Sequence, residues 1–122
     1  MDCDSPIDDV SAPGTRIISP NYPRNYESGK DCQITINLSE RVRIRFEAFD
    51  VESHSSCTKD YIQVREGDSA NSKSISPKLC GNTIPDAIES SNKSMTLIFH
   101  TDGSGVRSGF KILVEEIGKN ES

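Results

Sequence analysis

Several short stretches of the chain alternate between apolar and polar residues, which is the pattern of β-strands with one buried face. In the first of them, Cys32, Ile34 and Ile36 fall on one face. A shorter strand is predicted at 15–18, residues 1–14 are expected to be irregular, and 85–91 is the one stretch that suits a helical turn. The predicted alternating strands are 32–38, 42–46, 61–66, 95–99 and 109–115.

The apolar positions change parity after the second of these strands. Val42, Ile44 and Phe46 are even-numbered, whereas Phe49 and Val51 are odd-numbered. Because a slip of one residue would turn the buried face outward, we predict a β-bulge or bend near Glu47-Ala48.

Short alternating strands, regular turn signals and the lack of a convincing helix predict an all-β fold, a two-sheet antiparallel β-sandwich. The length of 122 residues favours one domain, which we place at 1–117, with 118–122 as a polar tail or linker. The whole chain holds 4 Leu, 13 Ile, 6 Val and 4 Phe. The core is therefore small, and the excess of Ile and Val over Leu favours strands.

Four cysteines predict disulfide bonds and an oxidising compartment. None forms a C-x-x-C pair, which argues against a zinc site. Four cysteines allow three pairings, and the sequence by itself does not choose among them, although pairing between neighbours would close loops of a few tens of residues. The cysteines are Cys3, Cys32, Cys57 and Cys80.

Other features agree with a secreted location. Three N-x-S sequons predict N-glycosylation at Asn37, Asn92 and Asn120. No signal peptide follows Met1, so we expect Met1 to precede a mature segment. No apolar run approaches the roughly 18 residues of a membrane span, and the net charge of −5 argues against nucleic acid as a partner.

Enzymatic chemistry has little support in the sequence. His54 and His100 are the only histidines, and no nucleophile elbow of the form G-x-S-x-G is present. Gly103-Ser104-Gly105 lacks the Lys of a phosphate-binding loop, so we interpret it as a turn. We therefore expect a non-catalytic domain.

Three acidic residues stand where a predicted strand begins or ends: Glu52, Asp60 and Asp102. If the fold brings these ends together, three carboxylates share a small volume, and like charges so close need protons or a cation to neutralise them. The alternative is three separate, solvated loop acids, which are common in a chain with 19 Asp and Glu.

An ordered series of motifs resembles one known family. The series runs through Cys3, Ser19-Pro20-Asn21-Tyr22-Pro23, Cys32, Phe46-x-x-Phe49-x-Val51-Glu52, Cys57-x-x-Asp60-Tyr61-Ile62-x-Val64-x-x-Gly67, Cys80-Gly81, Ser90-Ser91, Phe99-x-x-Asp102 and Gly109-Phe110. It resembles the CUB domain, an extracellular module of complement-type and tolloid-type modular proteases, neuropilins and spermadhesins. The resemblance covers residues 3–115, and Gln33 stands where the family often has Trp.

The resemblance implies a jelly-roll-like CUB fold with the disulfides Cys3–Cys32 and Cys57–Cys80. In the calcium-binding subset of the family, the positions of Glu52, Asp60 and Asp102 hold one calcium ion, and a backbone carbonyl at Ser104 or Gly105 completes the shell. Tyr22 is expected to support the acids by hydrogen bonding. A Lys or Arg side chain of an extracellular protein partner is expected to dock beside the ion.

A second surface offers an alternative function. Arg41, Arg43 and Arg45 share the outer face of one predicted strand. In the manner of spermadhesins, such a face would bind a sulfated glycan or mediate self-association into a dimer. The simpler interpretation is a solvated strand face whose charges pair across strands.

Overall fold

The computed structural model describes residues 8–19, 22, 24–52, 57–67, 73–102, 105 and 107–117. Within these ranges every regular element is a strand, which agrees with the all-β prediction. No helix in the same ranges is long and apolar enough to cross a membrane. The described strands are β1 (Asp8–Val10), β2 (Arg16–Ile18), β3 (Asp31–Asn37), β4 (Arg41–Asp50), β5 (Tyr61–Glu66), β6 (Ile88–Glu89), β7 (Ser94–His100) and β8 (Gly109–Ile117).

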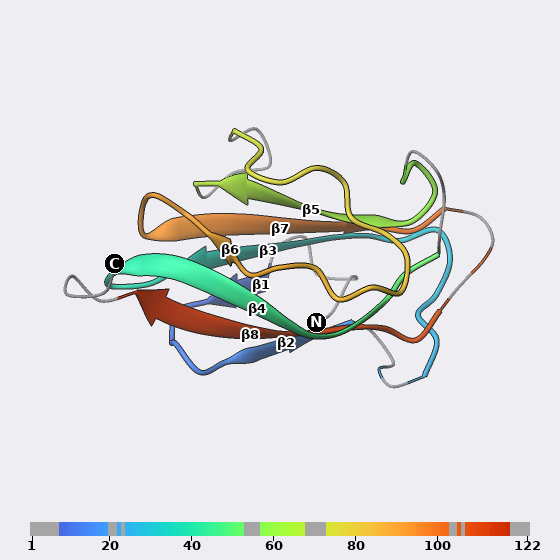
Figure 1. Ribbon diagram of the computed structural model, residues 1–122, viewed down its shortest axis with the longest axis horizontal. Helices are drawn as coiled ribbons and strands as arrows, with labels where there is room; N and C mark the ends of the chain where they lie inside the picture. Colours follow the sequence, from blue (N-terminus) through green and yellow to red (C-terminus); the bar gives the residue numbers. More distant parts are fainter. Residues whose placement is uncertain are drawn as a thin grey trace.

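The strands form two sheets that lie face to face (Figure 1). One sheet has the order β1-β3-β7-β5 and the other has the order β2-β8-β4-β6. All the pairings between these strands are antiparallel except that of β1, which runs parallel to β3. The predicted β-sandwich is therefore confirmed, with one parallel edge strand added to it.

Two short elements differ from the sequence prediction. Residues 1–14 were expected to be irregular, but Asp8–Val10 forms β1, and Val10 packs against the core. The stretch 85–91 contains the two-residue strand β6, which pairs with β4, in place of a helical turn. Strands of two or three residues are too short to show a period, so tertiary pairing decides their conformation.

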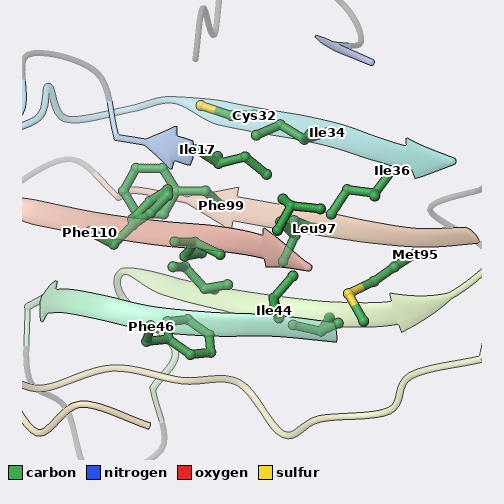
Figure 2. Close-up of a cluster of buried hydrophobic side chains, with 14 of the residues drawn as sticks. Ile17, Cys32, Ile34, Ile36, Ile44, Phe46, Met95, Leu97, Phe99 and Phe110 are labelled. Carbon is green, nitrogen blue, oxygen red and sulfur yellow. The ribbon is translucent and has the colours of Figure 1, made fainter. Parts of the chain in front are cut away.

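Side chains from the inner faces of both sheets fill the core (Figure 2). The alternating apolar positions of the two strands are all less than a tenth exposed: Cys32, Ile34 and Ile36 in β3, and Met95, Leu97 and Phe99 in β7. Phe99 of β7 contacts Phe110 of β8 edge to face, with ring centroids 4.9 Å apart, so it joins the two sheets. Tyr26 also contacts Phe99 edge to face, with ring centroids 5.1 Å apart.

The predicted bulge lies in β4. Phe46 pairs with Ile112 and Ala48 with Lys111, so Glu47 is the extra residue. The bulge moves Phe49 and Val51 onto the buried face, where they are 6% and 1% exposed. It also sets the direction in which the chain leaves β4 toward Glu52.

Strand direction divides the molecule into two ends. β4 runs away from the turn after β3 and finishes near Glu52, β5 begins just after Asp60, and β7 finishes near Asp102. This end, on the right in Figure 1, is called the acidic end below. The opposite end carries the turns that join β3 to β4 and β6 to β7.

Candidate metal centre

The fold brings the three predicted acids together at the acidic end. One carboxylate oxygen from each of Glu52, Asp60 and Asp102 lies within 4.8 Å of the others. Glu52 follows β4 in one sheet, whereas Asp60 and Asp102 flank β5 and β7 in the other. The cluster therefore bridges the two layers of the sandwich, and the interpretation as three separate loop acids does not hold.

Asp60 is the buried centre of this cluster. Its side chain is 0% exposed, and its Oδ1 accepts a hydrogen bond from the backbone N–H of Asp102 at 2.8 Å. Burial raises the pKa of Asp60 above its usual 3.8, and the neighbouring Asp102 carboxylate raises it further, while hydrogen bonds from Tyr26 and the Asp102 backbone oppose the shift. The folded chain thus holds a carboxylate whose charge is not fully balanced by the hydrogen bonds around it.

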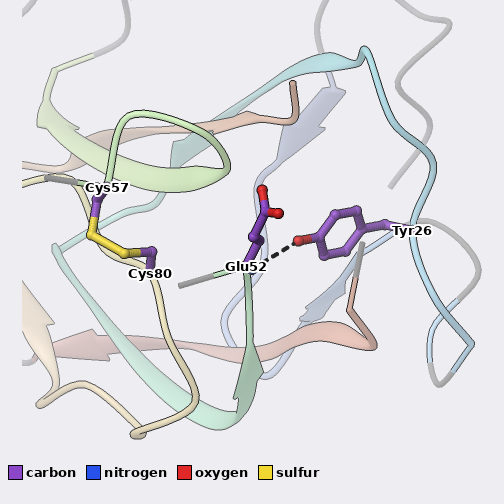
Figure 3. Close-up of a disulfide and its surroundings, with 4 residues drawn as sticks. All are labelled: Tyr26, Glu52, Cys57 and Cys80. Carbon is purple, nitrogen blue, oxygen red and sulfur yellow. Dashed lines mark hydrogen bonds between the residues drawn. A yellow bond between two sulfur atoms is a disulfide. The ribbon is translucent and has the colours of Figure 1, made fainter. Parts of the chain in front are cut away.

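The hydroxyl that reaches the cluster belongs to Tyr26. It donates to Asp60 Oδ2 at 2.6 Å and accepts from the backbone N–H of Glu52 at 3.1 Å (Figure 3). Burial, followed by the hydrogen bond to Asp60, raises the pKa of Tyr26, so the hydroxyl stays protonated and remains a donor.

We had predicted Tyr22 for this supporting role, and the structure gives these contacts to the tyrosine four residues later. Tyr22 is half-buried, and its backbone N–H donates to Ser19 O at 3.1 Å. Tyr26 is 2% exposed. Two tyrosines so close together carry no sequence pattern that separates them, although Tyr26 lies in the loop that is hydrogen-bonded to the end of β7.

Gly105 lies against the carboxylate of Glu52. Its φ of +75° is a conformation that L side chains rarely adopt, and a Cβ added there would stand 1.6 Å from Glu52 Oε2. Only glycine therefore lets the backbone approach this closely. Gly105 was predicted to offer a backbone carbonyl to the ion. Ser104, the other predicted contributor, lies outside the described residues.

The loop that carries Tyr26 is tied to the end of β7. Gly29 N–H donates to Asp102 O at 2.6 Å, and the buried Thr101 hydroxyl donates to Glu27 O at 2.9 Å while accepting from Lys30 N–H at 2.7 Å. Tyr26 N–H in turn donates to Arg107 O at 3.0 Å. These bonds hold the tyrosine and the last acid in one framework.

A disulfide fixes the other side of the site (Figure 3). Cys57 and Cys80 are bonded, as the family resemblance implied. Next to this bridge, Gly81 and Val51 exchange backbone hydrogen bonds of 2.8 and 2.9 Å, which anchors the chain just before Glu52. The Cys3–Cys32 pairing involves a residue outside the described part and stays a prediction, as does the tail at 118–122.

The donor set fits a hard divalent cation. It consists of carboxylate oxygens, and the cysteines at the edge of the site are in a disulfide. Glu52 Oε1 is buried without a hydrogen-bond partner in the described structure. An orphaned buried carboxylate oxygen is costly unless a cation or proton meets it. Oxygen ligands in an irregular arrangement suit calcium better than magnesium, which requires near-octahedral geometry.

The arginine face predicted as an alternative binding surface is paired across strands. Arg41 and Arg43 each approach Glu89 at 3.7 Å, and Arg43 Nε lies 3.2 Å from Glu115 Oε1, which Arg45 also contacts. Arg16 and Glu47 add a further pair at 2.8 Å. Acidic neighbours thus offset the positive charge of this face, as the simpler interpretation expected.

Comparison with known proteins identifies the family of this sandwich. The family model of the CUB domain matches residues 3–113, and the chain belongs to that family. Bone morphogenetic protein 1 of Xenopus laevis is 37% identical over 106 residues, which are 85% of this chain and 15% of that protein. Tolloid-like protein 1 of Homo sapiens is 38% identical over 97 residues, 78% of this chain and 10% of that protein. The chain thus spans a small part of these relatives.

Solved structures agree with this assignment. The CUB1-EGF-CUB2 domain of human MASP-1/3 superposes with a TM-score of 0.79 at 31% identity, covering 88% of this chain and 41% of that one. The MASP-1 CUB2 domain bound to Ca²⁺ superposes with a TM-score of 0.77 at 32% identity, covering 88% of this chain and 96% of that one. A similar domain therefore binds calcium.

Proposed function

We propose that this chain is a non-catalytic, extracellular protein-interaction module that binds one calcium ion at Glu52, Asp60 and Asp102. The observation that carries the proposal is the carboxylate cluster within 4.8 Å, in which Glu52 Oε1 has no hydrogen-bond partner in the described structure. The calcium-bound MASP-1 CUB2 domain supports the choice of metal.

Calcium at this site would organise a binding surface for a basic side chain. Three carboxylates against one divalent ion leave one net negative charge beside the metal. A Lys or Arg of a protein partner would meet that charge through charge-assisted hydrogen bonds, which are about twice as strong as neutral ones. The ion would also hold together loops from both sheets, so removing calcium would loosen the surface that the partner contacts.

An extracellular location agrees with the disulfide Cys57–Cys80, because such bonds persist in oxidising compartments. The tolloid and MASP relatives are longer proteins of which this chain matches one part. By analogy, the parent protein would be a modular one in which this domain contributes recognition and another part contributes any catalysis.

Thermal unfolding with calcium tests the metal site. A ligand that binds only the folded state adds about 2.7 kcal/mol at roughly 100 times its Kd. We expect a saturable rise in Tm when calcium replaces a chelator, absent in Asp60→Ala and retained in Glu40→Ala, which removes a carboxylate at the opposite end. A wild-type Tm that does not respond to millimolar calcium would refute the proposal.

A second measurement tests recognition of a basic side chain. Two immobilised peptides would be compared, identical except that one carries Lys where the other carries norleucine. We expect the oxidised domain to bind the Lys peptide only when calcium is present, and to lose this binding in Asp60→Ala. Calcium binding without any Lys preference would refute the partner chemistry while leaving the metal site intact.

A further inference from the structure

The end of the sandwich opposite the acids carries an open groove. It has a volume of about 520 Å³ and lies between the β3–β4 turn, with Glu40 and Arg41, the end of β5 at Gly67, and the turn 91–94. Its lining combines apolar wall surface with polar side chains and with charged side chains of both signs. Because β4 and β7 both run from this end to the acidic end, the groove is separated from the acids by the length of the strands.

A glycosylation sequon forms one wall of this groove. Asn92 and Lys93 lie exposed in the turn before β7, and Ser94 is the first residue of that strand. Asn92 Oδ1 accepts a hydrogen bond from the backbone N–H of Ser94 at 2.9 Å, a local turn in which the Asn side chain bonds the backbone two residues on. The amide oxygen is therefore held, and the amide nitrogen is the atom that a sugar would modify.

The neighbouring sequon begins at Asn37, which lies at the end of a strand and not in a turn. Asn37 is the last residue of β3 and pairs with Ser94 across the sheet. Its Oδ1 accepts a hydrogen bond from the Ser94 hydroxyl at 2.5 Å, and the next residue, Leu38, is buried and donates its N–H to Lys93 O at 2.9 Å. Asn37 is thus part of the strand framework that supports the Asn92 turn.

We propose that Asn92 carries an N-linked glycan whose first sugar lies in this groove. Asn92 Nδ2 forms a bond to the anomeric carbon of an oligosaccharide supplied on a lipid pyrophosphate. The bond from that carbon to the pyrophosphate oxygen breaks, the lipid pyrophosphate leaves with the electron pair, and the amide proton passes to a base of the transferase. Hydroxyl and acetamido groups of the sugar then meet the charged groups of Glu40, Arg41 and Lys93, and its C–H face meets the apolar part of the lining.

This placement separates two functions along the strands. The glycan covers the end that carries the β3–β4 and β6–β7 turns, and the acidic end stays open to an ion and a partner. The proposal rests on the extracellular location within the proposed function, but its outcome is independent of calcium. A domain without a glycan at Asn92 that still responds to calcium would overturn this inference alone.

Site-specific mass spectrometry tests the modification. The chain, secreted from eukaryotic cells, is digested before and after a peptide-N-glycosidase, which converts a glycosylated Asn to Asp and so marks the site. We expect conversion at Asn92, its loss in Asn92→Gln and Ser94→Ala, and its retention in Ser94→Thr, which preserves the sequon, and in Asn37→Gln. An unmodified Asn92 in the secreted wild-type protein would overturn the proposal.

Stepwise trimming tests the place of the first sugar. Protein from cells that make only high-mannose glycans is trimmed by an endoglycosidase to one sugar, or fully deglycosylated. In the Asn37→Gln/Asn120→Gln background, which leaves one sequon, we expect the single-sugar form to keep the Tm of the glycoprotein. Complete removal should lower Tm by a few degrees, to the value of Asn92→Asp made directly in the same background. Equal Tm values for the single-sugar form and Asn92→Asp would show that the sugar is not held in the groove.

Discussion

At the scale of single residues, the hydroxyl of Tyr26 connects two of the three acids. It donates to Asp60 and accepts from the Glu52 backbone. Tyr26→Phe keeps the ring that packs on Phe99 and removes both bonds. Because hydrogen bonds to charged groups contribute roughly 1.5–3 kcal/mol, we expect a loss of about 2 kcal/mol in the free energy of unfolding, measured by denaturant titration, and a higher Kd for calcium.

Tyr22→Phe is the matched control for that experiment. It removes a hydroxyl from a half-buried tyrosine in the same segment. We expect it to leave both the free energy of unfolding and the calcium Kd nearly unchanged. An equal loss in the two variants would return the supporting role to Tyr22, as the sequence motif had suggested.

The approach of Gly105 to Glu52 gives a second residue-level prediction. In Gly105→Ala the new methyl group would collide with Glu52 Oε2, so Glu52 must leave its position and calcium affinity should fall. Gly29→Ala is the control, because its φ of +69° imposes a similar backbone cost with nothing within 4 Å of the added atom. Isothermal titration should show weaker calcium binding in Gly105→Ala than in Gly29→Ala. Equal binding in both variants would remove Glu52 from the ligand set.

The pH dependence of stability follows from Asp60. Its pKa is raised in the folded chain, chiefly by burial, so between the unfolded and folded pKa values the folded state binds more protons than the unfolded one. Without calcium, the contribution of Asp60 to the free energy of unfolding therefore falls as pH rises through this window and is restored as pH falls. Asp60→Asn should remove that contribution. In chelator, the free energy of unfolding of the wild type should therefore fall relative to that of Asp60→Asn as pH rises from acidic to neutral.

Calcium should reverse this dependence in the wild-type protein. The ion needs ionised carboxylates, so protons compete with it and the calcium-induced rise in Tm should shrink as pH falls. The measurement is a series of melting curves from pH 4 to 8 with calcium or chelator. If the Tm difference between wild type and Asp60→Asn in chelator does not vary with pH, the assigned pKa shift of Asp60 is contradicted.

At the scale of elements, the bulge in β4 positions the site. Deleting Glu47 would restore a regular ladder and turn the following residues to the opposite face, exposing Phe49 and Val51. Exposing each such side chain costs roughly 1.5–3 kcal/mol, a large share of the usual 5–15 kcal/mol of stability. We expect the deletion to abolish cooperative unfolding and dispersed NMR signals.

Glu47→Ala is the control for the deletion. It keeps the chain length and loses only the exposed pair with Arg16, which is expected to cost at most about 1 kcal/mol. A well-folded deletion variant that binds calcium would mean that the register after Phe46 is not set by the bulge.

Alternation predicted the longer strands because each has enough residues to show a period and one face in the core. The parity change predicted the bulge for the same reason. β1 and β6 have three and two residues, so their backbones are placed by pairing with β3 and β4. The sequence had no local signal for either strand.

At the scale of the whole molecule, the acidic cluster depends on contacts between distant parts of the chain. The spacing of Glu52, Asp60 and Asp102 alone did not predict that they lie together. That prediction came from the ordered motifs that resemble the CUB family. The choice of Tyr26 over Tyr22 required the loop 24–30 to be tied to Thr101 and Asp102. Such a bond network leaves no period in the sequence, since its members follow the shape of the loop.

The disulfide Cys57–Cys80 contributes both to the stability of the fold and to the position of the acidic residues. It closes a loop across a sequence separation of 23, and such a loop contributes roughly 3 kcal/mol by restricting the unfolded chain. One end precedes Asp60 by three residues and the other adjoins the Val51–Gly81 bridge before Glu52.

We therefore expect the double variant Cys57→Ser/Cys80→Ser to lose about 3 kcal/mol in free energy of unfolding. The variant should also bind calcium more weakly, as measured by titration below its Tm. Since calcium stabilises only the folded chain, saturating calcium should recover part of the lost stability. If the variant loses stability but keeps the wild-type calcium Kd, the bridge restricts the unfolded chain without positioning the acids.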